Sequence, residues 1–165
     1  MNSRSVLAAG AAVAALGLGG GAAAHQTDRT ADAPYLRTTL NRVIDGDTVD
    51  TEAGRIRLLA INTPEVYGGV QCGGPQASAA MKRLLQPGDA VRLHPDAGEP
   101  NKDRYGRLLR YVYKTRSGTD DIGRELVREG WAEVYLKYPT SRTPAYLKVQ
   151  AVAKRHHRGI WGLCR

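Results

Sequence analysis

The sequence predicts a small α+β barrel built as a single domain. Its 165 residues leave room for one hydrophobic core but not for two. Short β-prone segments come first and helical segments are interspersed after them, and there is no phenylalanine, so the core must be aliphatic. Hydrophobic residues at 42% and charged residues at 24% are typical of a globular protein, which excludes wholesale disorder and a membrane bundle.

Residues 1–24 are predicted to be a cleaved secretory signal peptide. Arg4 precedes a run of alanine, glycine, leucine and valine, and three alanines end at Ala24, where we expect cleavage. The apolar run is short and rich in glycine, and no later segment reaches the roughly 20 apolar residues of a membrane span. We therefore expect a secreted, extracellular protein without stable membrane association. Residues 25–34 are polar and aperiodic and should form a flexible lead-in, and the folded domain should cover residues 35–165.

Export also decides how the cysteines are interpreted. Cys72 and Cys164 are the only two in the chain. In an oxidising compartment an even number of cysteines indicates a disulfide rather than a metal or redox site. The alternative is two unpaired thiols.

The first half of the domain reads as a β-meander followed by a helix. Asp45-Gly46 and Ala53-Gly54 are turn signals that separate three β-prone segments, at residues 40–44, 48–51 and 55–59. An apolar stripe at helical spacing then ends before Pro87-Gly88; its members are Ala77, Met81, Leu84 and Leu85.

The second half alternates strands with two further helices. Strands are expected at residues 91–93, 108–113 and 131–135, with a turn at residues 114–119. Asp121 should cap a helix that Gly130 closes, and Thr143-Pro144 should begin a basic helix that continues to Gly159.

The net charge points to a polyanionic partner. Lysine and arginine number 24 against 16 acidic residues, which gives a formal net charge of +8. Such a protein binds nucleic acid or another anionic surface, and charge alone does not distinguish between them.

Three segments concentrate residues that carry chemistry: 44–49, 57–65 and 103–107. The first two supply carboxylate and other oxygen ligands that suit a hard cation such as Ca²⁺. The second and third supply arginines that suit a phosphate whose negative charge rises in a transition state. Taken singly, each segment is also a common structural turn, so only their combination argues for hydrolysis of a phosphodiester.

Together these segments resemble the staphylococcal nuclease family from about Thr39 to Trp161. The matching motifs occur in the family's order: V-I-D-G-D-T-V, R-L-L-x-x-x-T-P-E, G-P-x-A-S, D-x-Y-G-R-x-L and L-V-R-E-G-x-A. The resemblance implies a five-stranded OB-fold barrel with about three helices packed against it. It also implies Ca²⁺-dependent hydrolysis of DNA and RNA with little sequence specificity, leaving 3′-phosphates. No protein partner is implied, and a monomer is expected.

The resemblance assigns a Ca²⁺ site to the first two segments. Asp47 would be the principal carboxylate ligand, Thr63 would bind through its backbone carbonyl, and Asn62 through its amide oxygen. Asp45 would hydrogen-bond to the ligands from just outside the metal's coordination sphere. Glu65 resembles the group that activates or orients the attacking water.

The substrate-binding roles follow in the same way. Arg57 and Arg107 would clamp the scissile phosphate through their planar guanidinium groups. Arg104 and Tyr105 resemble the residues that hold a neighbouring terminal phosphate, and Tyr135 the tyrosine that packs against the nucleotide.

One position departs from the family pattern. Asn62 occupies the place of a second aspartate ligand, and the loss of a formal negative charge should weaken Ca²⁺ binding. Two interpretations therefore stay open: an active nuclease, or a non-catalytic OB-fold protein that binds nucleic acid with a degraded metal site.

Overall fold

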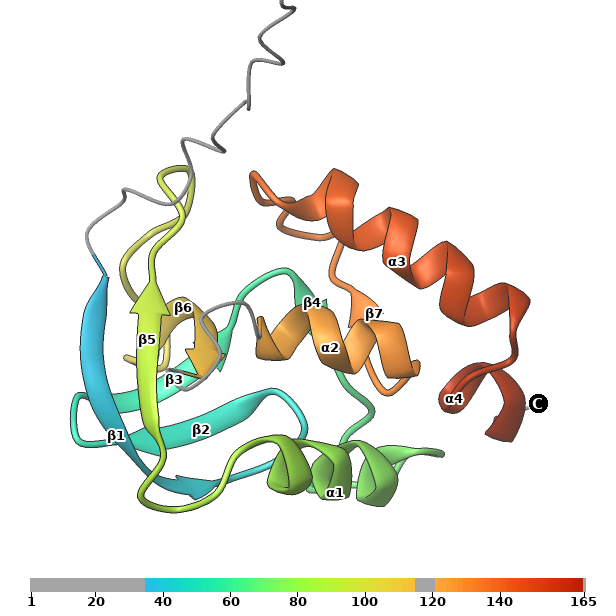
Figure 1. Ribbon diagram of the computed structural model, residues 1–165, viewed down its shortest axis with the longest axis horizontal. Coiled ribbons are helices and arrows are strands. Elements are labelled where there is room, and N and C mark those ends of the chain that lie inside the picture. Colours follow the sequence, from blue (N-terminus) through green and yellow to red (C-terminus); the bar gives the residue numbers. More distant parts are fainter. Residues whose placement is uncertain (1–34, 115–120, 165) are drawn as a thin grey trace, which may run out of the picture. The chain divides into compact units, whose positions relative to one another are not determined.

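The computed structural model describes residues 35–114 and 121–164, shown in colour in Figure 1. The predicted signal peptide at residues 1–24, the predicted lead-in at residues 25–34 and most of the predicted turn at residues 114–119 lie outside the described residues.

Five strands close into a barrel in the order β1-β2-β3-β6-β5. Their bounds are β1 (Leu36–Val43), β2 (Thr48–Thr51), β3 (Gly54–Leu58), β5 (Ala90–His94) and β6 (Leu108–Lys114). Neighbouring strands are antiparallel except β3 and β6, which run parallel and close the barrel. The predicted five-stranded α+β barrel is confirmed.

Three longer helices and one single-turn helix accompany the barrel (Figure 1): α1 (Gly74–Leu84), α2 (Ile122–Glu129), α3 (Thr143–Arg155) and α4 (Ile160–Leu163). Helix α2 packs against α1, α3 and strand β6. As predicted, the Asp121 side chain accepts a hydrogen bond from the backbone of Arg124 at the start of α2, and Gly130 ends the helix in the left-handed conformation. Within the two described ranges, no helix is long and apolar enough to cross a bilayer.

Several boundaries differ from the sequence prediction. Strand β1 begins at Leu36 rather than residue 40, because Leu36 pairs with Leu93 of β5. The expected strand at residues 131–135 shortens to β7 (Glu133–Val134), which pairs with β4 (Ile61–Asn62) in a separate two-stranded sheet. Helix α3 ends at Arg155 instead of continuing to Gly159, because His157 turns the chain with a φ of 49°.

The core is aliphatic, as the composition requires. Fully buried side chains from the barrel meet those from α1 and α2 in one cluster that includes Val49, Ile56, Leu93, Met81 and Leu126. Burial of such side chains contributes roughly 1.5–3 kcal/mol each and is the main force holding the helices on the barrel.

Asp121 connects three elements inside this fold. Besides capping α2, its carboxylate accepts hydrogen bonds from the hydroxyl of Tyr146 in α3, at 2.7 and 2.8 Å, and from the hydroxyl of Tyr113 in β6, at 3.2 Å. Arg142, just before α3, forms an ion pair with it at 3.3 Å. Burial nevertheless raises the pKa of Asp121.

Cys72 and Cys164 form a disulfide with a Cα–Cα distance of 5.8 Å. It joins the loop before α1 to the residue after α4. The approach is close, since a Cβ atom on Gly73 would lie 2.6 Å from Ile160 and 3.6 Å from the Cys164 sulfur. Gly73 has a φ of 85°, so glycine suits this position for two reasons.

Candidate active site

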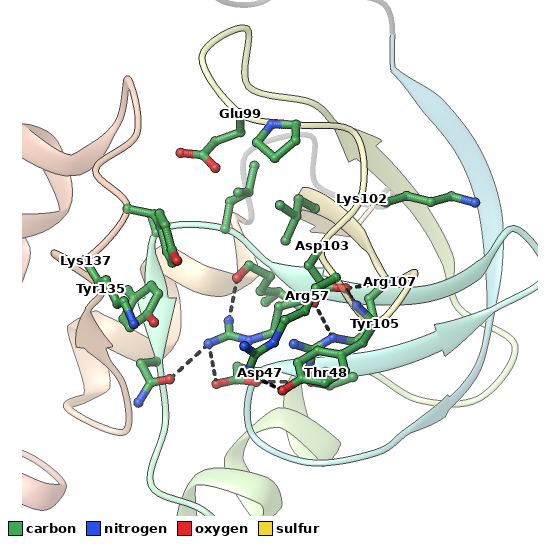
Figure 2. Close-up of a pocket in the computed structure, with 18 of the residues that line it drawn as sticks. Asp47, Thr48, Arg57, Glu99, Lys102, Asp103, Tyr105, Arg107, Tyr135 and Lys137 are labelled. Carbon is green, nitrogen blue, oxygen red and sulfur yellow. Dashed lines mark hydrogen bonds and ion pairs between the residues drawn. The ribbon is translucent and has the colours of Figure 1, made fainter.

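A pocket of about 550 Å³ opens on one side of the barrel (Figure 2). Its size is that of a pocket for a small organic ligand such as a nucleotide. All predicted site residues except Thr63 line it: Asp45, Asp47, Arg57, Asn62, Glu65, Arg104, Tyr105, Arg107 and Tyr135. Thr63 is buried beside the pocket and bonds to Asp47. Residues distant in sequence therefore meet at one site.

The turn between β1 and β2 presents two carboxylates. The backbone N–H of Asp47 donates to the Asp45 carboxylate at 3.0 Å, which fixes the turn. Asp47 Oδ2 in turn accepts from the backbone N–H of Thr63 at 3.0 Å and from its hydroxyl at 3.2 Å. A Cβ atom on Gly46 would lie only 2.5 Å from the Thr63 hydroxyl, so glycine is required here by the close approach of Thr63.

Arg57 is held by four acceptors at the end of β3. One terminal nitrogen donates to the backbone carbonyls of Leu58, at 2.6 Å, and Ile61, at 2.9 Å. The other donates to Asn62 Oδ1 at 3.0 Å and pairs with Asp47 Oδ2 at 3.1 Å. Figure 2 shows the guanidinium directly above Asp47. The arginine is therefore fixed in position before any ligand arrives.

The chain reverses between Arg57 and Asn62 through an unusual backbone conformation. Ala60 has a φ of 65°, in the left-handed region that side chains other than glycine rarely adopt. Its carbonyl accepts a hydrogen bond from the backbone of Tyr135 at 2.8 Å. This turn, together with the β4–β7 pairing, brings the end of β3, Asn62 and Tyr135 to the same pocket.

Arg107 reaches the pocket from the residue before β6. In the parallel β3–β6 pair Arg57 lies opposite Leu109, so Arg107 is two positions away and on the same face of the sheet. Asp103 accepts from Arg107 Nε at 2.7 Å and from the backbone N–H groups of Tyr105 and Arg107. Burial alone would raise the pKa of Asp103, but these donors lower it below its usual range.

Tyr105 extends from the same turn and is 67% exposed. The guanidinium groups of Arg104 and Arg107 lie 4.7 and 5.4 Å from its ring centre. These three residues make an exposed cationic edge that suits an anion arriving from solvent.

Glu65 is an exposed residue that lines the pocket, and hydrogen bonds anchor its backbone. The backbone N–H donates to the Gln71 side chain at 3.0 Å, and the Glu65 carbonyl accepts from the Gln71 backbone at 3.0 Å. Gly74, the first residue of α1, packs so closely that a Cβ atom there would lie 2.4 Å from the Glu65 carbonyl. The G-P-x-A-S motif therefore fixes the loop that carries Glu65.

Sequence reasoning missed several residues of the pocket, among them Glu99 and Tyr138. Tyr138 is 56% exposed, and its ring lies 5.9 Å from that of Tyr135. Lys137, between them in the sequence, also lines the pocket and is labelled beside Tyr135 in Figure 2. Glu99 belongs to the polar loop just upstream of the D-x-Y-G-R motif. Its closeness in sequence to that motif is the feature that could have indicated its place in the pocket.

The oxygen donors of this site fit a hard divalent cation. They are the carboxylates of Asp45 and Asp47, the amide oxygen of Asn62 and the backbone carbonyl of Thr63, with no sulfur or imidazole among them. Burial, and then the neighbouring Asp47, raise the pKa of Asp45, so the two carboxylates repel one another and a cation would relieve this repulsion. Within the described ranges no three His, Cys, Asp or Glu residues gather at one point, so the site offers a cation few protein charges.

Chemically, the pocket combines two fixed guanidinium groups, a pair of carboxylates and an exposed glutamate. Fixed arginines stabilise an anion whose charge increases during a reaction, and a free carboxylate can orient or deprotonate water.

Comparison with known proteins identifies one matching family and several similar nucleases. The family described as staphylococcal nuclease homologue matches residues 55–162. The chain is 34% identical to the thermonuclease of Staphylococcus hyicus over 128 residues, which cover 73% of this chain and 72% of that protein. It is 31% identical to endonuclease YncB of Bacillus subtilis (strain 168) over 153 residues, 83% of this chain and 70% of that protein. It is also 33% identical over 138 residues to endonuclease YhcR of the same organism, of which it spans only 11%.

Proposed function

The chain belongs to the staphylococcal nuclease family, and from this we propose that it is a Ca²⁺-dependent nuclease that hydrolyses phosphodiester bonds of DNA and RNA. It would cut with little sequence specificity and leave 3′-phosphates. The proposal rests on one observation: a single pocket is lined by Asp47, Arg57, Glu65 and Arg107.

Arg57 and Arg107 bind and stabilise the phosphate. They come from adjacent parallel strands and are each held by a carboxylate, Asp47 and Asp103 respectively. Both guanidinium groups are already in position before substrate binds, so they need not reorganise during the reaction. They therefore stabilise the five-coordinate transition state, whose phosphorus carries more negative charge on its oxygens than the substrate does. The proton of the attacking water goes to Glu65, whose carboxylate is exposed at the end of the pocket.

Asp47, Asn62 and Thr63 would hold the Ca²⁺, and Asp45 would hydrogen-bond to them from just outside the coordination sphere. The cation would supply positive charge that stabilises the transition state for attack by water. Arg104 and Tyr105, on the exposed edge, hold a neighbouring phosphate, and Tyr135 packs against the nucleotide. The net charge of +8 attracts a polyanion from solution, so binding should weaken steeply with salt.

The place of action follows from the predicted leader. We propose that residues 1–24 direct export, with cleavage near Ala24, and that the mature protein acts outside the cell as a monomer without stable membrane association. An extracellular setting agrees with the Cys72–Cys164 disulfide.

A second candidate is a nucleic-acid-binding protein without activity, and Asn62 is the observation that favours it. Asn62 brings no charge, and its amide oxygen already accepts from Arg57 at 3.0 Å. This candidate predicts nucleic-acid binding that Ca²⁺ does not alter, and activity that appears only in Asn62→Asp.

The test is cleavage of denatured DNA across a Ca²⁺ series, measured as acid-soluble nucleotide, with a chelator control. Glu65→Gln and Arg107→Ala should each reduce kcat by at least about a hundredfold. Glu52→Gln is the matched control, because Glu52 is an exposed glutamate that does not line the pocket. Full activity of Glu65→Gln would refute its role, and no cleavage at any Ca²⁺ concentration would favour the binding protein.

A further inference from the structure

Glu99 is one of five carboxylates that line the pocket, and it belongs to none of the three segments singled out in the sequence. It lines the pocket together with five cationic residues: Arg57, Lys102, Arg104, Arg107 and Lys137. Figure 2 places it at the opposite end from Asp47 and Arg57, while Lys102 points away from it. Across residues 35–114 and 121–164, no lysine or arginine forms an ion pair with Glu99. Burial and the nearby Asp96 raise its pKa, as expected for a carboxylate that no cation compensates.

The loop that carries Glu99 is held in place by Asp96. The Asp96 carboxylate accepts from the hydroxyl of Tyr111 at 2.8 Å, from the backbone of Gly98 at 3.1 Å, and from both the backbone and the hydroxyl of Ser141. The backbone N–H of Glu99 donates to the Asp96 carbonyl at 3.2 Å. Glu99 is therefore a partly exposed residue on an anchored loop of the pocket wall.

The same anchor fixes the aromatic wall of the pocket. Ser141 lies three residues after Tyr138, so the Asp96–Ser141 bonds tie the segment carrying Tyr135 and Tyr138 to the loop carrying Glu99. Tyr135 and Tyr138 offer ring faces on which a nucleobase can stack. The Arg57 guanidinium lies 6.0 Å from the Tyr135 ring centre, so the aromatic wall begins beside a phosphate-binding arginine. Glu99 adds a hydrogen-bond acceptor to the same pocket, at the end away from Arg57.

A carboxylate at this end repels phosphate, so its partner must be another part of a nucleotide. Ionised carboxylates only accept hydrogen bonds. A second metal is not indicated, because Asp96, the nearest acidic group, already accepts four hydrogen bonds. The remaining donors on a nucleic acid are the N–H groups of the bases and the hydroxyl of ribose, and only the bases stack on tyrosine.

We propose that Glu99 reads the base of the nucleotide bound in this pocket and favours guanine. Guanine presents two adjacent N–H donors, on N1 and N2, that match the two oxygens of a carboxylate. Thymine and uracil present a single N–H between two carbonyl oxygens, which the carboxylate repels, and adenine and cytosine present one amino group. The inference rests on the proposed nuclease function and refines it: a preference of about tenfold at one nucleotide still allows cutting at many sequences.

The first experiment measures kcat/KM on four single-stranded heptanucleotides that are all thymine except for the central base. The wild-type protein should cut beside guanine about ten times faster than beside thymine. Glu99→Gln, which keeps the shape but replaces one acceptor by a donor, should reduce this ratio to below about threefold, and Glu52→Gln should leave it unchanged. Equal rates on all four substrates, or an unchanged ratio in Glu99→Gln, would overturn the inference while leaving the nuclease function intact.

The second experiment keeps the inference testable if no substrate is cut, which would count against the nuclease function itself. Isothermal titration with the 3′-phosphates of deoxyguanosine and thymidine, in Ca²⁺, compares their affinities for the wild-type protein and for Glu99→Gln. Tighter binding of the guanine nucleotide that is lost in Glu99→Gln supports the role of Glu99. Equal affinities in the wild-type protein refute it.

Discussion

Replacing Gly46 by alanine should destabilise the protein and disturb the proposed Ca²⁺ site. A Cβ atom at this position would lie 2.5 Å from the Thr63 hydroxyl, 2.8 Å from its Cβ and 2.9 Å from its methyl group. Gly46 is not among the residues with positive φ, so alanine brings no backbone strain and the whole effect comes from this collision.

The size of the expected loss of stability depends on which group moves to relieve the collision. Inserting a methyl group into a packed site costs about 1–3 kcal/mol. If Thr63 retreats instead, Asp47 loses hydrogen bonds now made at 3.0 and 3.2 Å, and a bond to a charged group contributes about 1.5–3 kcal/mol. We therefore expect the free energy of unfolding to fall by about 3 kcal/mol. The Ca²⁺ concentration for half-maximal activity should rise, because Thr63 is one of the proposed ligands.

Urea unfolding followed by the fluorescence of Trp131 and Trp161 measures the change in stability. A loss of this size should move the midpoint by about 1.5 M at an ordinary slope. Gly98→Ala is the matched control, because a Cβ atom there meets its nearest neighbour, Asp96, at an ordinary 3.5 Å. Its stability should stay within about 1 kcal/mol of the wild-type value.

A double-mutant cycle with Thr63→Ala tests the collision, because alanine removes two of the three atoms that Gly46→Ala would strike, the hydroxyl at 2.5 Å and the methyl at 2.9 Å, and leaves the Cβ contact at 2.8 Å. The two substitutions should couple by at least about 1 kcal/mol. Gly46→Ala with wild-type stability, or strict additivity with Thr63→Ala, would refute the close approach as the reason for glycine.

Three further predictions concern other parts of the molecule. Reduction of the Cys72–Cys164 disulfide, which closes a loop of 92 residues, should lower the free energy of unfolding by up to about 4–5 kcal/mol, as measured by urea unfolding with and without reductant; a loss below about 1 kcal/mol would contradict this. Burial and two nearby arginines lower the pKa of His94. The contribution of His94 to the free energy of unfolding is therefore complete above the unfolded pKa of about 6.5 and is lost progressively as pH falls toward the lower folded pKa. The free energy of unfolding of His94→Gln should vary less with pH over this window, and substitution of the exposed His156 by glutamine is the control. Asn62→Asp should lower the Ca²⁺ concentration needed for activity by about tenfold, checked by isothermal titration of Ca²⁺; an unchanged Ca²⁺ affinity would show that position 62 does not contribute to the site.

Local sequence signals were sufficient for the order and type of most of the elements. The aspartate at position 121 and the glycine at position 130 marked both ends of α2, because caps depend on backbone geometry within a few residues. The three segments stood out because phosphate cleavage calls for carboxylates and arginines, whereas the role of each residue was implied by the resemblance to the nuclease family and stays a prediction. The structure brings these residues to one pocket.

What the sequence did not reveal depends on contacts between distant segments. The β4–β7 pair joins Ile61 to Val134, and each strand is only two residues long, too short for a periodic signal. In the sequence, Glu99 is one of several charged residues in a polar loop. In the structure, the hydrogen bonds that Asp96 accepts from Tyr111 and Ser141 hold this loop against the pocket. The glycine at position 46 suggested a hairpin turn, whereas its reason is a threonine 17 positions further along the chain.

The convergence of β6, α2 and α3 on Asp121 governs how the protein opens. No one of these elements can detach without leaving a buried carboxylate short of donors, which is expensive in a nonpolar interior. The barrel and the helices should therefore open as a single cooperative unit, and amide hydrogen exchange should report one common free energy for all three. The pocket wall that carries Tyr135 and Tyr138 lies in the chain between α2 and α3, so it shares this cooperativity and is as long-lived as the core itself.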